Sequence, residues 1–164
     1  MFSSFTTSVG RLVAIATIGF WAASAAAAPV GPFAGFGGAW SGLGQVHLAN
    51  GTKESLHCRA TYKVGADGRT MHQSLRCASD SYKFELTSDI ESQGNQISGR
   101  WSESTRRLAG KLTGQASLGR LNVLVQGDVL NAEVTLVSQG DRQTVTISSP
   151  GSQLSGAAIS LRRS

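Results

Sequence analysis

Alternation of apolar and polar residues constrains this chain more than any other feature of its sequence. From Gly38 to the C-terminus of the 164-residue chain the alternation keeps a period of two, with no sustained helical period. Turn-forming pairs such as Asn50-Gly51, Asp67-Gly68 and Gly140-Asp141 separate the alternating segments at intervals of roughly ten residues. This pattern is typical of an all-β chain whose strands each have one buried face.

The segment from 55 to 78 illustrates how alternation predicts strand pairing. A two-residue turn at Asp67-Gly68 pairs Val64 with Met71 and Cys58 with Cys77, and it gathers the apolar side chains of both strands on one face. A loop longer by one residue would scramble both faces, because successive side chains point to opposite faces. Only a slip by two residues would preserve the faces.

The same test predicts the remaining hairpins. An odd number of loop residues is required at Asn50-Gly51 to bring the apolar faces of the flanking strands together. Elsewhere two-residue turns are expected, with the following pairs: Cys77 with Tyr82 around Ser79-Asp80, Ile90 with Gly99 around Gly94-Asn95, Trp101 with Leu108 around Ser104-Thr105, and Leu136 with Val145 around Gly140-Asp141. Further strands are expected over 120–126 and 154–161.

These hairpins predict one antiparallel domain over 38–164. Short loops require antiparallel neighbours, because a parallel crossover needs about a dozen residues or more. A meander of about eight to ten strands with one apolar face does not remain open, so we expect a closed up-and-down barrel, with a β-sandwich as the alternative. The opposite face is polar and charged, which favours a soluble barrel over an outer-membrane barrel.

The N-terminal segment has the features of a secretory signal peptide over 1–27. Arg11 precedes the apolar stretch 12–23, and small residues follow at 24–28. The apolar stretch is shorter than the about 20 residues that span a bilayer, so we expect cleavage, with an uncleaved anchor as the alternative. The mature chain would have no transmembrane segment and would be periplasmic or extracellular. Residues 28–37 are expected to be a flexible Pro/Gly lead-in, unless Phe33 and Phe36 dock on the barrel.

The two cysteines are expected to form one structural disulfide. Exported chains favour disulfides, and the predicted register places Cys58 opposite Cys77 on the apolar face. Counted from a two-residue turn, the pair occupies a hydrogen-bonded position with α-carbons about 5.5 Å apart. A redox or metal pair would be expected to show Cys-x-x-Cys spacing, which is missing here.

The candidate catalytic groups are sparse and scattered, which predicts a protein that is not an enzyme. Alternation places His47, His57 and His72 on the polar face, without the converging ligands of a metal site. The sequence has no phosphate-binding loop, dinucleotide fingerprint or Gly-x-Ser-x-Gly elbow, so no cofactor is expected. A Ser-His-Asp arrangement defined by geometry alone stays open, so an envelope hydrolase or a protein inhibitor is kept as an alternative.

Charged residues suggest two surface features. The carboxylates Asp89, Glu91, Glu85 and Glu103 surround one hairpin and are interpreted as solvated strand edges. The cations of the neighbouring strands share the outer face and form a candidate anion-binding face: Arg59, Lys63, His72 and Arg76. It would suit an anionic envelope polymer, or it is a solubilising surface. No aromatic platform accompanies it, which argues against specific nucleic-acid binding.

One motif resembles a known group of proteins. Gly38-Ala39-Trp40 opens the first strand of the meander, and Gly99-Arg100-Trp101 repeats the spacing. The opening motif and the meander resemble calycins, the group of lipocalins and avidin-like proteins. This resemblance implies a carrier of a small apolar ligand, with a cavity near Trp40, Tyr62 and Trp101.

The chain also resembles small exported proteobacterial proteins of unknown function. The residues that carry this second resemblance are Gly-x-Trp-Ser-Gly-x-Gly at 38–44, Cys-Arg-Ala-Thr-Tyr at 58–62 and the segment 75–84. It implies no activity. The expected protein is therefore a non-enzymatic exported barrel of unknown specific function, which would suit an envelope or extracellular binding module. The calycin-like carrier is the alternative. An open lumen of about 300 Å³ or more would favour the carrier.

Overall fold

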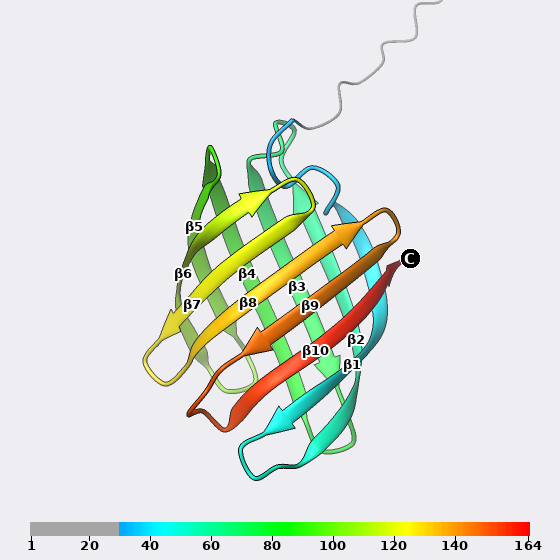
Figure 1. Ribbon diagram of the computed structural model, residues 1–164, viewed down its shortest axis with the longest axis vertical. Helices are drawn as coiled ribbons and strands as arrows, with labels where there is room; N and C mark the ends of the chain where they lie inside the picture. Colours follow the sequence, from blue (N-terminus) through cyan, green and yellow to red (C-terminus); the bar gives the residue numbers. More distant parts are fainter. Residues whose placement is uncertain (1–29) are drawn as a thin grey trace, which may run out of the picture.

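The computed structural model describes residues 30–164, and the predicted signal peptide lies outside the described residues. The described part contains ten strands, numbered in chain order (Figure 1). Their bounds are β1 Gly38–Leu48, β2 Lys53–Val64, β3 Thr70–Ala78, β4 Lys83–Gln93, β5 Gln96–Glu103, β6 Leu108–Ser117, β7 Arg120–Gly127, β8 Asn131–Gln139, β9 Arg142–Ser148 and β10 Leu154–Arg163. Within 30–164 no helix is long and apolar enough to cross a membrane.

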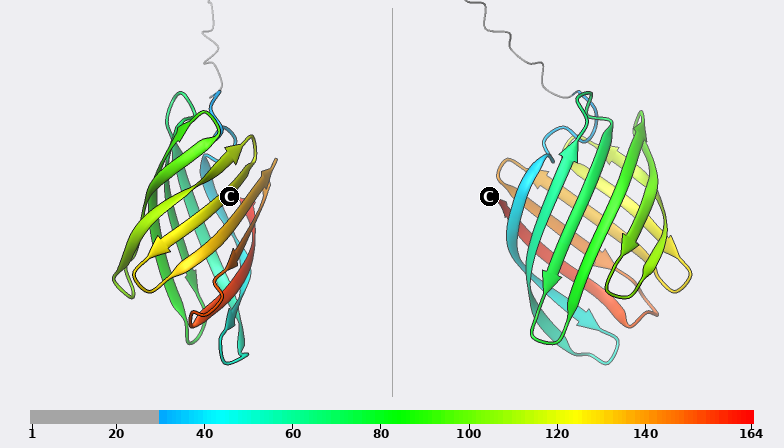
Figure 2. Two further views of the ribbon diagram at one scale, coloured as in Figure 1. Left: turned by 60° about the vertical axis from the view of Figure 1, so that its left-hand side comes forward. Right: turned by 180° about the vertical axis from the view of Figure 1, so that it is seen from behind.

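The ten strands form a closed antiparallel barrel. Each strand pairs with the next along the chain, and β1 also pairs with β10 from Trp40 opposite Arg163 to Leu48 opposite Leu154. The two views in Figure 2 show the strands tilted around a single axis, with no strand left at an edge. The predicted all-β closed barrel is confirmed, because closure gives every strand two hydrogen-bonded neighbours.

Most of the predicted registers are confirmed. Cys58 pairs with Cys77, Ile90 pairs with Gly99, and Leu136 pairs with Val145. The β1–β2 loop has the expected odd length, since the Leu48 N–H donates to the Thr52 carbonyl. Apolar side chains of these strands therefore point into the barrel.

Two predicted registers are wrong by two residues. Cys77 pairs with Phe84 instead of Tyr82, and Trp101 pairs with Gly110 instead of Leu108. A slip of two preserves the faces, so alternation alone does not decide between the registers. Each observed loop is instead held by a carboxylate: Glu54 accepts bonds from the β3–β4 loop, and Glu103 accepts bonds from the β5–β6 loop.

The segment 31–37 closes one end of the barrel, so the alternative in which Phe33 and Phe36 dock replaces the expected flexible lead-in. Phe33 and Phe36 are both 0% exposed and belong to the core. The Gly31 N–H donates to the Asp67 carbonyl at 2.9 Å, which ties the segment to the β2–β3 loop. Burial of two aromatic side chains outweighs the conformational freedom of the neighbouring glycines.

Arg163, near the C-terminus, fastens this segment from the other side. Its guanidinium lies over the Trp40 ring at 4.2 Å and donates through Nη2 to the Gly35 carbonyl at 2.8 Å. Its Nη1 also donates to the Gly37 carbonyl. The Trp40 indole donates to the Phe36 carbonyl at 2.9 Å. The two ends of the described chain thus meet at the closed end of the barrel.

Candidate ligand-binding cavity

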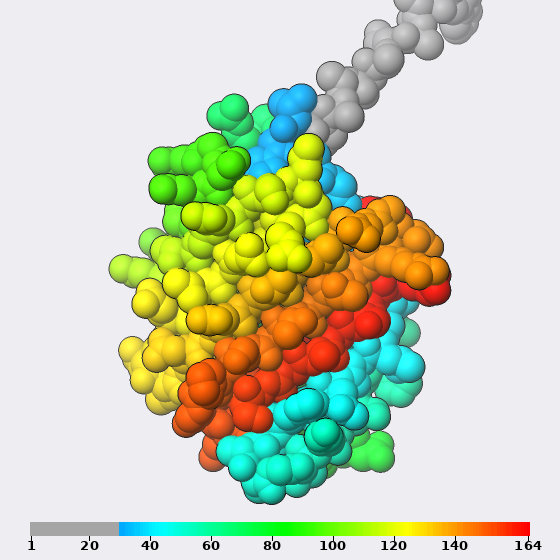
Figure 3. Space-filling view, viewed as in Figure 1, coloured from blue at the N-terminus to red at the C-terminus, as the bar shows by residue number. Residues whose placement is uncertain are grey.

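An apolar cavity of about 910 Å³ occupies the half of the barrel away from the N-terminal segment. The loops 49–52, 79–82, 104–107, 128–130 and 149–153 surround this end, at the bottom of the view in Figure 1. Most of the wall is aliphatic or aromatic, because the inward positions of the strands are apolar. Representative wall residues are Val46, Leu56, Phe84, Leu86, Val125, Val134, Ile147 and Ile159. On the outside, β7–β10 and β1 form one side of the molecule (Figure 3).

Trp101 forms part of the cavity wall, and two glycines make room for it. A β-carbon added to Gly110 would lie 2.8 Å from the indole nitrogen, and one added to Gly127 would lie 2.9 Å from indole atom Cζ2. The indole N–H donates to the Gln126 carbonyl at 3.2 Å. This hydrogen bond satisfies the polar atom of the ring, so the rest of the indole can present an apolar surface to the cavity.

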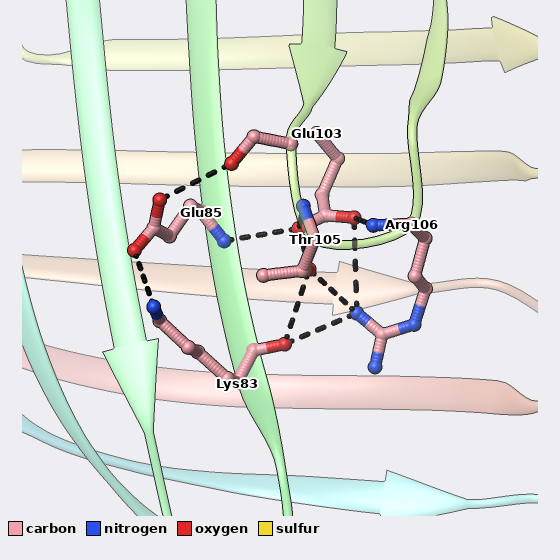
Figure 4. Close-up of polar contacts among 6 residues, drawn as sticks. Lys83, Glu85, Glu103, Thr105 and Arg106 are labelled. Carbon is pink, nitrogen blue, oxygen red and sulfur yellow. Dashed lines mark hydrogen bonds and ion pairs between the residues drawn. The ribbon is translucent and has the colours of Figure 1, made fainter.

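Glu103 is a buried carboxylate in the same wall, only 2% exposed. Its oxygens accept backbone N–H bonds from Glu85 at 3.1 Å, Thr105 at 3.0 Å and Arg106 at 2.8 Å, together with the Thr105 hydroxyl (Figure 4). Burial raises the pKa of Glu103, but these hydrogen bonds outweigh that effect and hold the pKa below its ordinary value. The ionised side chain therefore fastens the β5–β6 loop to β4.

Arg106 and Tyr82 lie beside each other at the mouth of the cavity. The Arg106 guanidinium carbon is 4.4 Å from the centre of the Tyr82 ring, and Arg106 Nη1 is 3.8 Å from Glu103 Oε2. Burial raises the pKa of Tyr82, and the charge of Arg106 partly opposes that shift. Both side chains line the cavity, so the mouth combines an aromatic surface with a fixed positive charge.

The three aromatic residues predicted to face a ligand are separated by the structure. Trp101 lines the cavity, whereas Trp40 and Tyr62 are buried at the closed end beneath the N-terminal segment. The Tyr62 hydroxyl donates to Gln143 Oε1 at 2.7 Å, and its ring packs near Phe36 with centroids 6.4 Å apart. Docking of 31–37, which alternation does not predict, turns these two rings into packing residues.

The disulfide joins Cys58 and Cys77 inside the barrel, and Cys77 reaches the cavity wall. The α-carbons are 4.1 Å apart, closer than the distance predicted for a hydrogen-bonded pair. The last ladder bond runs from the Gly65 N–H to the Thr70 carbonyl, so the loop is longer than two residues. Counting outward from that bond places the cysteines at a non-hydrogen-bonded position, where α-carbons approach more closely.

The histidines do not converge on the cavity. His57 and His72 are exposed, His47 is half-buried, and none lines the cavity wall. His72 Nδ1 lies 2.6 Å from Asp89 Oδ1 on the outer surface. Within the part of the chain that the structure describes, no group of three or more His, Cys, Asp or Glu could hold a metal ion.

The candidate anion-binding face lies on the outside of β2 and β3. Arg59 stands opposite Arg76, and Lys63 stands opposite His72. All four side chains are exposed. Carboxylates of β4 adjoin the face, because Arg76 pairs with Glu85 and His72 pairs with Asp89. Anion binding by this face stays a prediction.

Glu103 and Arg106 line the cavity, although neither is predicted to do so from the sequence. The expectation of a solvated strand edge is wrong for Glu103, which lies two residues after Trp101 and therefore on the same face of β5. The alternation of β5 therefore indicates that Glu103 points into the barrel. Arg106 lies in a loop, where no alternation applies, so only the three-dimensional position of the loop brings it to the mouth.

The fold of this chain is similar to that of a solved structure. No family model and no curated protein sequence matches the chain. An S-type phycobiliprotein lyase, CPES from Guillardia theta, has a similar fold, with a TM-score of 0.51 and 13% sequence identity. The match covers 78% of this chain and 88% of the lyase. At this identity the likeness concerns the fold alone.

Proposed function

We propose that this protein is an exported, non-enzymatic carrier that binds a small apolar ligand inside its barrel. The observation that carries the proposal is the cavity of about 910 Å³ with its apolar wall. Ligand-binding pockets commonly have volumes of about 300–1,000 Å³ and combine apolar walls with a few polar groups. Side chains therefore do not fill the whole lumen, and a ligand can bind inside the barrel.

Three further observations support the proposal. The Cys58–Cys77 disulfide is suited to an oxidising compartment outside the cytoplasm. None of the three histidines lines the cavity wall that contains the buried carboxylate Glu103, which is the reason to prefer binding over hydrolysis. The fold is shared with a phycobiliprotein lyase, although at 13% identity its activity is not transferred to this chain.

A small ligand is preferred to an anionic polymer as the partner. The outer cationic face is adjoined by Asp89 and Glu85, which offset part of its charge. The cavity, in contrast, has an aliphatic and aromatic wall that an apolar molecule would complete.

Two variants on neighbouring positions of β10 test the proposal. Ala157 points into the cavity, whereas Ala158 is exposed on the outer surface. Titration with the neutral fluorescent probe N-phenyl-1-naphthylamine should show saturable binding to the wild type. Ala157→Phe should weaken that binding by about tenfold or more, because the added ring occupies cavity space. Ala158→Phe adds the same ring outside and should leave binding unchanged.

The outcome is read together with the fold of each variant. Circular dichroism should give the same strand signal for all three proteins. No saturable binding by the wild type, or equal weakening by both variants, would contradict a ligand site in the lumen. Native mass spectrometry of protein purified from the periplasm provides a second readout, since a retained apolar molecule should be released on unfolding.

A further inference from the structure

We propose that Arg106 selects ligands with an anionic head group, so that the carrier takes amphipathic anions such as long-chain carboxylates. The inference rests on the proposed function and adds the chemical class of the ligand. Arg106 and Glu103 are the charged side chains of the cavity wall, and they differ in whether they can still bind a ligand.

Glu103 is already fully engaged. Its two oxygens receive three backbone N–H bonds and one hydroxyl bond, and the side chain is almost completely buried. A ligand cation would have to displace these donors to reach the carboxylate. The negative charge therefore holds the loop and leaves little acceptor capacity toward the cavity.

Arg106 lines the cavity, and only its Nη1 atom is engaged in side-chain hydrogen bonds within 30–164. Its Nη1 donates to the Lys83 carbonyl at 3.1 Å and to the Thr105 hydroxyl at 3.3 Å. For its Nε and Nη2, the residues from 30 to 164 provide no acceptor. The side chain is 41% exposed, and its contact with Glu103 is a long one at 3.8 Å. An arginine with free donors is suited to a carboxylate or phosphate, which it can bind through parallel hydrogen bonds.

The place of Arg106 at the mouth of the cavity suits it to bind the head group of a ligand. The guanidinium stacks on Tyr82 in the rim loop 79–82, and that loop is tied to β2 because Ser79 and Ser81 donate to Glu54 at 2.5 Å. Beyond the rim the wall is apolar as far as Trp101 and Ile159. An elongated ligand could thus bury its chain in the lumen while its head remains at Arg106.

The neighbouring charges do not duplicate this site. Lys83 is paired with Glu85 at 2.9 Å, and Glu85 also accepts from Ser104. Arg107 is exposed and is not part of the cavity wall. Arg107 therefore serves as a matched control, because it has the same charge one residue farther along the loop.

Competition with decanoate, decyl phosphate, 1-decanol and decylammonium tests the inference. Each compound displaces N-phenyl-1-naphthylamine from the wild type, from Arg106→Gln and from Arg107→Gln. We expect the wild type to prefer the two anions over the alcohol by about tenfold, and decylammonium to bind most weakly. The two anionic probes distinguish a carboxylate head from a phosphate head.

The variants determine whether Arg106 causes the preference. Arg106→Gln should bring the affinity for decanoate down to that for 1-decanol, and Arg107→Gln should keep the preference of the wild type for anions. Equal affinity of the wild type for decanoate and 1-decanol, or an unchanged preference in Arg106→Gln, would overturn the inference and leave the carrier function standing. Failure of every compound to compete in a wild type that binds the fluorescent probe would also overturn it, whereas absence of probe binding would overturn the proposed function itself.

Discussion

Glu103 shows how one side chain can be both buried and charged. Its carboxylate lies in an apolar wall, where an unpaired charge would be costly, but four donors compensate it. The same bonds attach the loop 104–107 to β4, so the residue connects local loop structure with the mouth of the cavity. The charge of Glu103 is thus stabilised by hydrogen bonds that the spacing of residues in the sequence does not predict.

Replacement of this carboxylate should destabilise the barrel. Glu103→Gln places an amide nitrogen among backbone N–H donors, so we expect the free energy of unfolding to fall by about 2 kcal/mol at neutral pH. Glu91→Gln, at an exposed position of β4, should have little effect. Urea unfolding followed by circular dichroism measures both changes, and equal stability of the two variants would contradict the role assigned to Glu103.

The pH dependence of stability should reveal the same residue. Because the folded-state pKa of Glu103 lies below its ordinary value of 4.5, its ionised form contributes stability above that pH. The contribution is lost as the pH falls through the folded-state pKa. The stability difference between wild type and Glu103→Gln should therefore shrink on acidification below about pH 4.5. A difference that stays constant down to about pH 2 would exclude this linkage.

At the scale of elements, hairpin registers were predicted where turn chemistry and alternation agree. Gly94-Asn95 and Gly140-Asp141 are favoured turn pairs, and their registers are confirmed. Around Asp80 and Thr105 the turns lack such a pair, and carboxylates outside the loops hold them in a register shifted by two. A contact between segments distant in sequence holds the first loop, since Glu54 of β2 binds Ser79 and Ser81. The second loop is held locally, because Glu103 binds the Thr105 and Arg106 N–H groups that follow it.

The N-terminal segment 31–37 depends on β10 for its position. Arg163→Gln should increase amide hydrogen exchange in 31–37, because it removes the stacking on Trp40 and bonds to the Gly35 and Gly37 carbonyls. Arg162→Gln is the matched control, since Arg162 is exposed and contacts Asp141 at 3.5 Å. Exchange measured by mass spectrometry should separate the two variants. Unchanged protection in Arg163→Gln would show that the two phenylalanines hold the segment unaided.

At the scale of the whole molecule, the disulfide should stabilise the closed barrel against unfolding. The bond between Cys58 and Cys77 encloses a sequence separation of 19 residues, so its reduction should lower the free energy of unfolding by about 3 kcal/mol. Urea unfolding with and without reductant measures the loss, and Cys58→Ser/Cys77→Ser should match the reduced protein. Detection of two free thiols in protein purified without reductant would contradict the bond.

Alternation and turn residues by themselves determined that the chain is all-β and antiparallel, and they predicted that Cys58 faces Cys77, because side-chain direction in a strand follows from local geometry. Pairing of β1 with β10 decided between a closed barrel and a β-sandwich. The tertiary structure decided which part of the lumen is filled. Phe33 and Phe36 dock over Trp40 and Tyr62 at one end, while the other end keeps a cavity of about 910 Å³. It also decided that Arg106 stands at the mouth. These features depend on the packing of segments distant in sequence, which a local period does not specify.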